Sequence, residues 1–200
     1  MKQKNVSTTY SHEVRIIGGR WKRSKLTVAD KAGLRPTPDR VRETLFNWLG
    51  QDLTGWRCID AFAGTGALGF EAASRGASEV LLVEQDTALV AQLKRVQLQL
   101  QASATQIVRG DGVAALRQLA AASMDAVFLD PPFDSALFEA SLQAAARALA
   151  PDGFVYLEAP ILWCQAALEP IGLTLYRHLR AGTVHAHLLR LLPPAQAQAA

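Results

Sequence analysis

The chain has little cysteine and no long apolar run, and both absences limit what it can be. Its 200 residues include two cysteines, Cys58 and Cys164, which lie far apart and outside any metal-ligand spacing. This scarcity supports neither a zinc site nor a disulfide framework, and it is consistent with a reducing compartment. No apolar run approaches the ~18 residues that a membrane helix needs. The polar start MKQKNVSTTYSHEV lacks the apolar core of a signal peptide, so we expect a cytoplasmic protein with no membrane partner.

Acidic residues are scarce in the first quarter of the chain. Residues 1–50 hold 11 Lys/Arg against 4 Asp/Glu, whereas residues 51–200 hold 10 against 14, so the net charge of +3 conceals an asymmetry. A local excess of positive charge favours a partner that carries phosphates over a small neutral metabolite. A solvated basic tail would give the same count. With half its residues hydrophobic and a fifth charged, the chain is typical of soluble globular proteins.

The pattern along the chain predicts one domain with two ends outside it. We expect a flexible arm over residues 1–13, a single domain over 14–192 and a disordered tail over 193–200. Within the domain, VRIIGGRWKRSKLTV predicts two short strands around Gly18-Gly19. The outer positions of this hairpin carry basic side chains that we expect to contact a phosphate backbone, namely Arg15, Arg20, Lys22, Arg23 and Lys25.

A helix is predicted after the basic hairpin, in LRPTPDRVRETLFNWLG. Thr37 suits the cap, Pro38 the first helical position and Asp39 the positive end of the helix dipole. Residues 14–50 thus form a basic hairpin and helix, and 56–192 the core. In the core, apolar runs at about 57–62, 79–84, 106–109, 124–130 and 153–158 alternate with helical segments, and two strand-like runs joined at Ala181-Gly182 follow. This alternation predicts an α/β fold with a mostly parallel sheet covered by helices on both faces.

The segment CIDAFAGTGALGFEAA is a strand, a glycine-rich turn and the start of a helix. Gly64, Gly66 and Gly69 match G-x-G-x-x-G, and Glu84 lies 20 residues past Gly64. This spacing is the dinucleotide-binding fingerprint, but S-adenosylmethionine binding uses the same features: small residues that admit a ligand to the backbone and an acid for the ribose. Asp60, at the strand end before Phe62, suits a cationic methionine group better than a pyrophosphate.

Acids follow four successive predicted strands, at Asp60, Glu84, Asp111 and Asp130. The carboxyl ends of parallel strands lie along one edge of a sheet, where ligands bind. Asp111 either binds an adenine amino group or caps the next helix. A line of carboxylates suits a cationic ligand, so the pattern favours S-adenosylmethionine over a nicotinamide dinucleotide.

The segment FLDPPF after the fourth of these strands predicts a site for amine methylation. Asp130 and the carbonyl of Pro131 are placed to accept the two N–H groups of a nucleobase amine, and Pro132 completes a rigid loop. Phe133 can stack on a flipped base, a contact worth roughly 1–3 kcal/mol. A strand-terminating turn with Phe133 in the core is the alternative.

Taken in order, RIIGGRWKRSKL, RPTPDRVRETLFNWL, DAFAGTGALGFEAASRGA, VEQD and VFLDPPF resemble the RsmD family over about residues 14–190. The resemblance implies a Rossmann-like class I methyltransferase fold with a seven-stranded, mostly parallel sheet and an antiparallel C-terminal strand. It also implies that S-adenosylmethionine is the cofactor and that the 2-amino group of one guanine in 16S ribosomal RNA is the substrate, in an assembled or assembling 30S subunit.

The resemblance also implies roles for single residues. Asp60, Phe62, Gly64 and Gly66 would line the methionine side of the cofactor, Glu84 would hold its ribose and Asp111 its adenine. The segment that contains Thr37 would close over the methionine end, and Asp130 to Phe133 would hold the guanine amine. Arg40 would face RNA or pair with Glu43 on the helix surface, as would Arg42, and at least one of the two arginines is expected in such a surface pair.

Three other readings remain open at this point: amine methylation of another RNA or of DNA adenine, a non-catalytic RNA-binding protein of the same fold, and a nicotinamide oxidoreductase. We expect a monomer and no metal site. For His185 and His187, on the last predicted strand, solvent-facing or packed positions are the expectation.

Overall fold

The structure, a computed structural model, describes residues 13–27, 37–133 and 136–193. The predicted arm and tail therefore lie outside the described residues, except that Glu13 belongs to the first strand and Pro193 lies beyond the last one. Within the described ranges, no helix has the length and apolarity needed to cross a bilayer.

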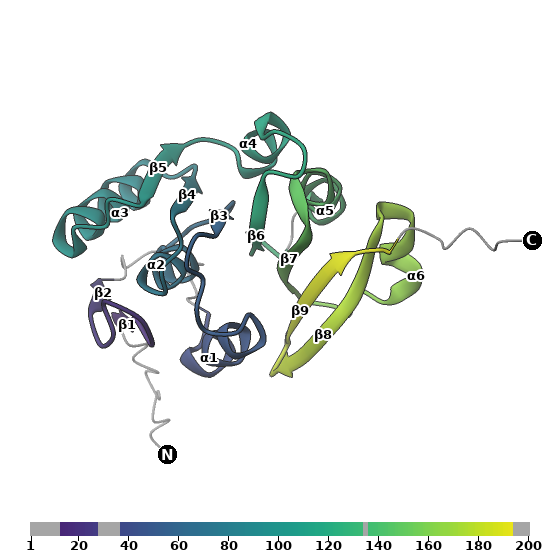
Figure 1. Ribbon diagram of the computed structural model, residues 1–200, viewed down its shortest axis with the longest axis horizontal. Helices are drawn as coiled ribbons and strands as arrows, with labels where there is room; N and C mark the ends of the chain where they lie inside the picture. The colour runs from purple at the N-terminus through teal and green to yellow at the C-terminus, as the bar shows by residue number, and fades with distance from the viewer. Residues whose placement is uncertain (1–12, 28–36, 134–135, 194–200) are drawn as a thin grey trace, which may run out of the picture.

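A seven-stranded sheet forms the centre of the molecule (Figure 1). The elements in chain order are β1 (Glu13–Arg15), β2 (Lys25–Thr27), α1 (Asp39–Trp48), β3 (Arg57–Asp60), α2 (Ala67–Ser74), β4 (Glu79–Glu84), α3 (Thr87–Leu100), β5 (Thr105–Arg109), α4 (Gly112–Gln118), β6 (Met124–Leu129), α5 (Leu137–Ala148), β7 (Leu149–Ala159), α6 (Gln165–Leu168), the 3-10 turn η1 (Glu169–Ile171), β8 (Leu173–Ala181) and β9 (Val184–Leu191). The sheet order is β5-β4-β3-β6-β7-β9-β8. Strands β3 to β7 pair in parallel, and β9 is antiparallel to both of its neighbours. The predicted fold class and the antiparallel C-terminal strand are confirmed.

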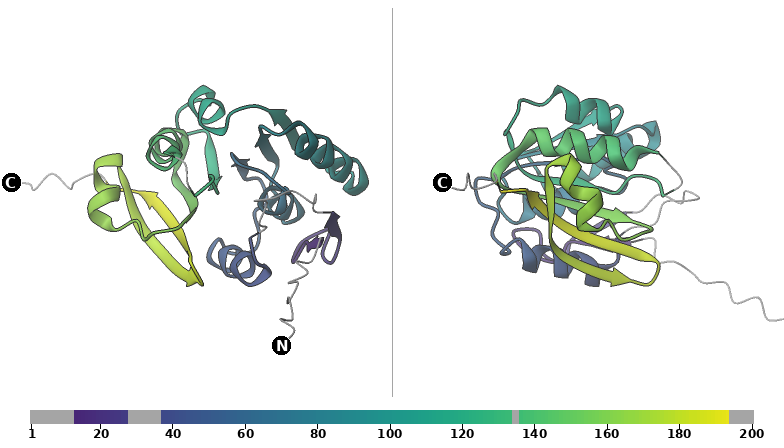
Figure 2. Two further views of the ribbon diagram at one scale, coloured as in Figure 1. Left: turned by 180° about the vertical axis from the view of Figure 1, so that it is seen from behind. Right: turned by 90° about the vertical axis from the view of Figure 1, so that its right-hand side faces the viewer.

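Helices cover both faces of the sheet, and each face has its own core (Figures 1 and 2). Successive side chains of a strand point to opposite faces, so Cys58 packs with α1, α2 and α3 whereas Ile59 packs with α4 and α5. Burial on two faces explains why the strands read as continuous apolar runs rather than as an alternation.

The N-terminal hairpin is confirmed, and Gly18 and Gly19 lie in its connection. Val14 pairs with Leu26, and the connection runs from Ile16 to Ser24. Within this connection, Gly19 lies against α2. Its φ is 70°, and a Cβ there would lie 1.9 Å from the carbonyl oxygen of Ser74, so the close approach requires glycine. The N–H of Arg20 donates to the same carbonyl at 2.7 Å.

A buried carboxylate fixes this hairpin to α2. Glu71 is fully buried and accepts from the backbone N–H groups of Ile17 and Gly18 at 2.7 and 2.8 Å. The Nε of Arg75 donates to it at 2.8 Å, and a guanidinium nitrogen of Arg42 lies 3.6 Å away. Since α2 directly follows the glycine-rich turn, the basic hairpin and that turn are attached to one helix.

Helix α1 begins differently from the prediction. Pro38 is its N-cap residue, and no side chain caps the helix, because the Thr37 hydroxyl bonds to Glu158 instead. Arg40 is exposed, as a surface role requires. Arg42 is not at the surface. It is fully buried, donating from Nε to the Thr37 carbonyl at 3.3 Å and from a second nitrogen to Asp39 at 2.6 Å.

Candidate functional site: a carboxylate-lined cavity at the sheet edge

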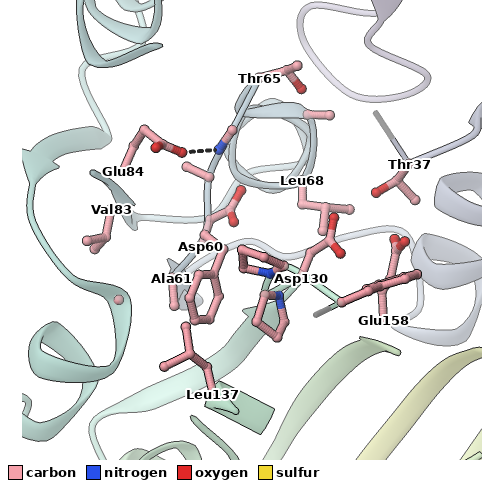
Figure 3. A pocket seen from close by; sticks show the side chains of 18 of the residues that line it. Thr37, Asp60, Ala61, Thr65, Leu68, Val83, Glu84, Asp130, Leu137 and Glu158 are labelled. Atoms are coloured by element: carbon pink, nitrogen blue, oxygen red, sulfur yellow. Dashed lines mark hydrogen bonds between the residues drawn. The ribbon is translucent and has the colours of Figure 1, made fainter. Parts of the chain in front are cut away.

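A cavity of about 710 Å³ opens at the carboxyl ends of β3, β4, β6 and β7. Cavities of this size suit ligands the size of a nucleoside cofactor. Thr37, before α1, and the β8–β9 turn with its flanks, Ala181–Val184, complete its wall. Figure 3 shows Asp60, Asp130 and Glu158 around the same space. The sheet edge predicted to bind a ligand is therefore the hollowed one.

The glycine-rich turn is held by the two acids predicted beside it. Asp60, at the end of β3, is buried, and its Oδ2 accepts from the N–H of Gly69 at 3.0 Å. Glu84, at the end of β4, accepts from the N–H of Gly64 at 2.8 Å (Figure 3). Asp60, Phe62, Gly64 and Glu84 all line the cavity. These four predicted residues are thus brought together.

Gly66 and Asp111 occupy different places. Gly66 is the N-cap residue of α2, with a φ of 77°, and is absent from the cavity wall formed by the described residues. Asp111 caps α4, accepting from the N–H of Ala114 at 2.7 Å, and also accepts from Gln85 at 2.9 Å. Asp111 therefore forms the predicted cap, and the flanking Gly110 and Gly112 line the cavity while Asp111 does not.

The Asp-Pro-Pro-Phe segment follows β6 and faces the same cavity. Asp130, Pro131, Pro132 and Phe133 all line it. Pro131 is buried, whereas 41% of Phe133 is exposed. The alternative of a core phenylalanine is therefore wrong. An exposed ring at the mouth of a cavity offers a free face to a flat ligand.

Glu158, near the end of β7, is a cavity residue that the sequence analysis missed. It is 4% exposed and lines the cavity next to Asp130. The hydroxyl of Tyr156 donates to it at 2.9 Å, and the hydroxyl of Thr37 forms a second hydrogen bond. One signal in the sequence could have identified Glu158 as a site residue. It is a lone carboxylate in the apolar run FVYLEA, at the end of the next strand after Asp130. It was missed because β7 continues to Ala159, so Glu158 lies within the strand, whereas Asp130 lies after its strand.

The cavity acids are electrostatically strained. Burial raises the pKa of Asp60 to about 7, with the N–H of Gly69 opposing the shift and the charge of Glu84 adding to it. Burial also raises the pKa of Asp130 well above its usual range, and the charges of Glu158 and Asp60 raise it further. Glu158 shifts in the same direction through burial, opposed by the hydroxyls of Thr37 and Tyr156 and the charge of Arg42. A cationic or N–H-donating ligand would relieve these costs.

The predicted RNA-contacting residues are all exposed. Five lie in or beside the N-terminal hairpin and one on α1: Arg15, Arg20, Lys22, Arg23, Lys25 and Arg40. Trp21, between them, is partly buried against the core on the α2 side of the sheet. The hairpin thus presents cations to solvent while its tryptophan anchors it.

Comparisons with known proteins agree with this arrangement. Residues 14–190 match the family model described as "Conserved hypothetical protein 95". The chain is 42% identical over 163 residues to "Ribosomal RNA small subunit methyltransferase D" of Escherichia coli, covering 80% of this chain and 81% of that protein. It is 40% identical over 178 residues to the protein of the same name from Haemophilus influenzae, covering 82% and 92%.

Solved structures give the same picture. The putative methyltransferase yhhF from Escherichia coli superposes with a TM-score of 0.77 at 35% identity, over 90% of this chain and 98% of that one. A precorrin-6y methyltransferase from Geobacter metallireducens, at 18% identity and a TM-score of 0.65, covers 82% and 93% and shares the fold alone.

Proposed function

Because the chain belongs to the RsmD family, we propose that it transfers a methyl group from S-adenosylmethionine to the exocyclic 2-amino group of a guanine in 16S ribosomal RNA. The observation that carries this proposal is the convergence of Asp60, Glu84 and the Asp130–Phe133 segment on one cavity, in a chain that matches these relatives over most of its length.

The cavity fits the cofactor by the chemistry of its wall. S-adenosylmethionine supplies an electrophilic methyl group on a sulfonium. Asp60 offers a buried carboxylate to the positive methionine end, and Glu84, already fixed by Gly64, retains acceptor capacity for ribose hydroxyls. Gly64 and the adjoining Thr65 keep the backbone accessible. The Asp111 carboxylate accepts two hydrogen bonds, as that of Glu84 does, and likewise retains acceptor capacity for an adenine amino group beside the cavity residues Gly110 and Gly112.

The Asp-Pro-Pro-Phe segment would hold the amine. The nitrogen lone pair of a guanine amine is delocalised into the ring, which makes the amine a poor nucleophile. Asp130 and the Pro131 carbonyl accept its two N–H groups and favour a pyramidal nitrogen with a free lone pair. Pro132 stiffens the loop, and the exposed ring of Phe133 stacks on the flipped base. Positioning and oriented dipoles then account for most of the rate.

Glu158 extends this clamp to base selection. Guanine presents N–H donors at N1 and at the 2-amino group on one edge, and the neighbouring carboxylates of Glu158 and Asp130 are matched acceptors. Adenine has an acceptor at N1, which would face a carboxylate and repel it. A site built from buried acceptors rejects a base that lacks the donors, because its own groups would remain unpaired.

The substrate we propose is 16S ribosomal RNA in an assembled or assembling 30S subunit, met by a monomer in the cytoplasm. The exposed cations of the N-terminal hairpin would bind phosphates near the target nucleotide. Because Glu71 attaches that hairpin to α2, RNA held there lies at a fixed distance from the cofactor loop.

A direct test uses 30S subunits from cells that lack this enzyme, incubated with the protein and labelled S-adenosylmethionine. Mass spectrometry of the digested RNA should find label in 2-methylguanosine. The label should disappear with Asp130→Ala, while that variant still binds S-adenosylmethionine in a titration. Label in methyladenine, or in no nucleoside of the subunit, would refute the assignment. Binding of a nicotinamide dinucleotide in place of S-adenosylmethionine would refute the cofactor too.

A further inference from the structure

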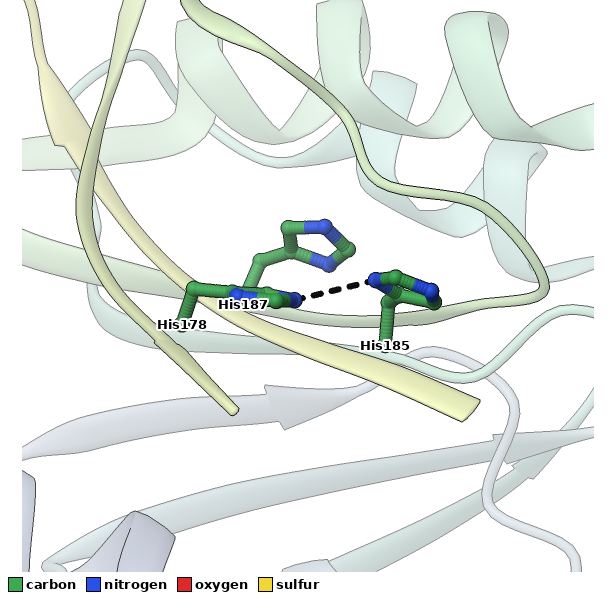
Figure 4. Close-up of side chains that lie close together, drawn as sticks. All are labelled: His178, His185 and His187. Atoms are coloured by element: carbon green, nitrogen blue, oxygen red, sulfur yellow. Dashed lines mark hydrogen bonds between the residues drawn. The ribbon is translucent and has the colours of Figure 1, made fainter. Parts of the chain in front are cut away.

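Three of the chain's four histidines gather on the C-terminal hairpin, outside the lining of the carboxylate cavity. His178 lies on β8, and His185 and His187 lie on β9 (Figure 4). In the antiparallel ladder His178 is paired with His187, and Arg180 with His185. Residues that are paired, or two apart on one strand, share a face, so the three imidazoles project from the same side of the hairpin.

The ring nitrogens of this cluster lie at near-coordinating distances. One ligand atom from each histidine can be chosen so that all three lie within 4.8 Å of one another. Nε2 of His178 and Nδ1 of His185 are 3.0 Å apart. Two nitrogens bound to one tetrahedral zinc ion at 2.0–2.1 Å are separated by about 3.3 Å. This pair therefore already has nearly the spacing of two nitrogen ligands of one ion.

His187 has the orienting contact that metal-bound histidines usually have. Its Nδ1 lies 3.2 Å from the carbonyl oxygen of Leu157, to which it donates in the tautomer that leaves Nε2 as the acceptor. Nε2 accepts from the N–H of Trp163 at 3.1 Å. Trp163 belongs to the loop between β7 and α6. Coordination through His187 therefore requires this loop to give up one hydrogen bond.

The pKa values of two of the three imidazoles are lowered. Burial lowers the pKa of His187 to about 4 and also lowers the pKa of His178, and the charges of neighbouring histidines lower both further. Arg180, on the same face, donates from Nε to the carbonyl of Gly182 at 3.2 Å. His178 is exposed and His185 partly so, which leaves the site open to an ion from solvent.

We propose that His178, His185 and His187 form a binding site for a divalent transition-metal ion of the zinc class. An all-imidazole ligand set favours Zn²⁺, Ni²⁺ and Cu²⁺ over Mg²⁺ and Ca²⁺, which prefer oxygen. The site has a structural consequence for the enzyme, because residues 181–184 at the tip of this hairpin line the carboxylate cavity. A bound ion would tie β8 to β9 directly behind that wall.

The test is a calorimetric titration of the full chain, first stripped with a chelator, using Zn²⁺ alone. We expect one equivalent to bind, and we expect His178→Ala and His185→Ala each to weaken binding by at least about tenfold. Zn²⁺ should raise the melting temperature of the unmodified chain but not that of these two variants, since an ion that binds only the folded state stabilises it. Both side chains reach solvent, so neither variant should fail to fold.

Two controls separate this site from incidental binding. His12→Ala removes a histidine outside the described residues, and Cys164→Ser removes an exposed thiol that also attracts zinc. Both should bind as the unmodified chain does. A chain that takes up no Zn²⁺ at 100-fold molar excess, an affinity unchanged in His178→Ala and His185→Ala, or an affinity lost in Cys164→Ser would overturn the proposal.

Discussion

Two groups of carboxylates, buried except for the partly buried Asp130, differ in what compensates them. Glu71, beneath the N-terminal hairpin, meets two backbone N–H groups and the guanidinium groups of Arg42 and Arg75. Asp60, Asp130 and Glu158, at the sheet edge, lie close enough for their charges to oppose one another. Both groups are costly to bury. Glu71 is compensated by two guanidinium groups, whereas at the sheet edge Arg42 acts on Glu158, and the charge of Asp60 opposes that of Asp130.

The difference teaches how to separate scaffold from site. A compensated acid such as Glu71 fastens one element to another. Acids whose pKa values are raised by burial and by like charges are unfavourable in the charged form in the free protein. A ligand that brings positive charge or N–H donors stabilises that charged form. On this account the sheet-edge cavity binds a cation and an amine because its carboxylates lack enough partners within the protein.

The largest effect should come from removing the compensated acid. Glu71→Ala would leave the buried guanidinium group of Arg75 without its carboxylate and Arg42 with Asp39 alone, and it should lower the free energy of unfolding by about 3–5 kcal/mol. Urea denaturation would measure it. Glu79→Ala, at an exposed position on β4, should change stability by less than about 0.5 kcal/mol. Equal losses in the two variants would show that Glu71 fastens nothing.

Glu158→Gln tests an acid of the other kind. The substitution keeps the volume and removes the negative charge, so methyl transfer should slow by about 10²-fold, the usual cost of losing one oriented polar group from an active site. Stability should be unchanged or higher, since a strained carboxylate is gone. Single-turnover methylation with saturating cofactor gives the rate. A rate within twofold of the unmodified enzyme would exclude Glu158 from the clamp.

The pH dependence of cofactor affinity tests whether Asp60 is one of the uncompensated acids that bind the cofactor. Below its pKa of about 7, Asp60 in the free protein is protonated, and a cationic ligand must displace that proton. Affinity for S-adenosylmethionine should therefore rise through pH 7 and fall about tenfold for each unit below it. Calorimetry in buffers of different ionisation enthalpy would detect the released proton. In Asp60→Asn the profile should flatten, and a profile as steep as the original would contradict the assignment.

The smallest effect concerns the basic hairpin. Lys22→Ala should weaken RNA binding a few-fold, equally for all sequences, and should reduce the salt-dependence slope by about 1, because one phosphate contact is lost. Arg117→Ala, exposed on α4 at the opposite face of the sheet, is the matched control and should leave the slope unchanged. Filter binding at several salt concentrations is sufficient. The same slope in both variants would remove the hairpin from the RNA interface.

Sequence patterns predicted the sheet because each strand is marked by a short apolar run. The apolar runs at β3 to β7 and the acids that follow β3, β4 and β6 can be read from the chain, and parallel strands bring their ends together. Glu158 was missed because it lies inside the buried part of β7 rather than after it. Its position depends on where the strand ends, which is the least predictable feature of an element.

The burial of two other charged residues, Glu71 and Arg42, was not predicted, because their structural role depends on contacts distant in the sequence. Glu71 and Arg42 are charged residues at helical positions, where a surface role is the ordinary expectation. Nothing near them in the sequence shows that a hairpin more than 50 residues away supplies donors to Glu71. The contact of Gly19 with Ser74 could not be predicted for the same reason, since the two residues are equally distant in the sequence.

The most direct test measures the free energy of unfolding and the methyl-transfer rate in Asp130→Ala and Glu71→Ala side by side. The account predicts opposite losses: Asp130→Ala keeps or gains stability and loses methyl transfer, whereas Glu71→Ala loses stability and, while still folded, retains methyl transfer when S-adenosylmethionine and RNA are saturating. If both variants lose stability and activity in the same proportion, the division between compensated and strained carboxylates is wrong.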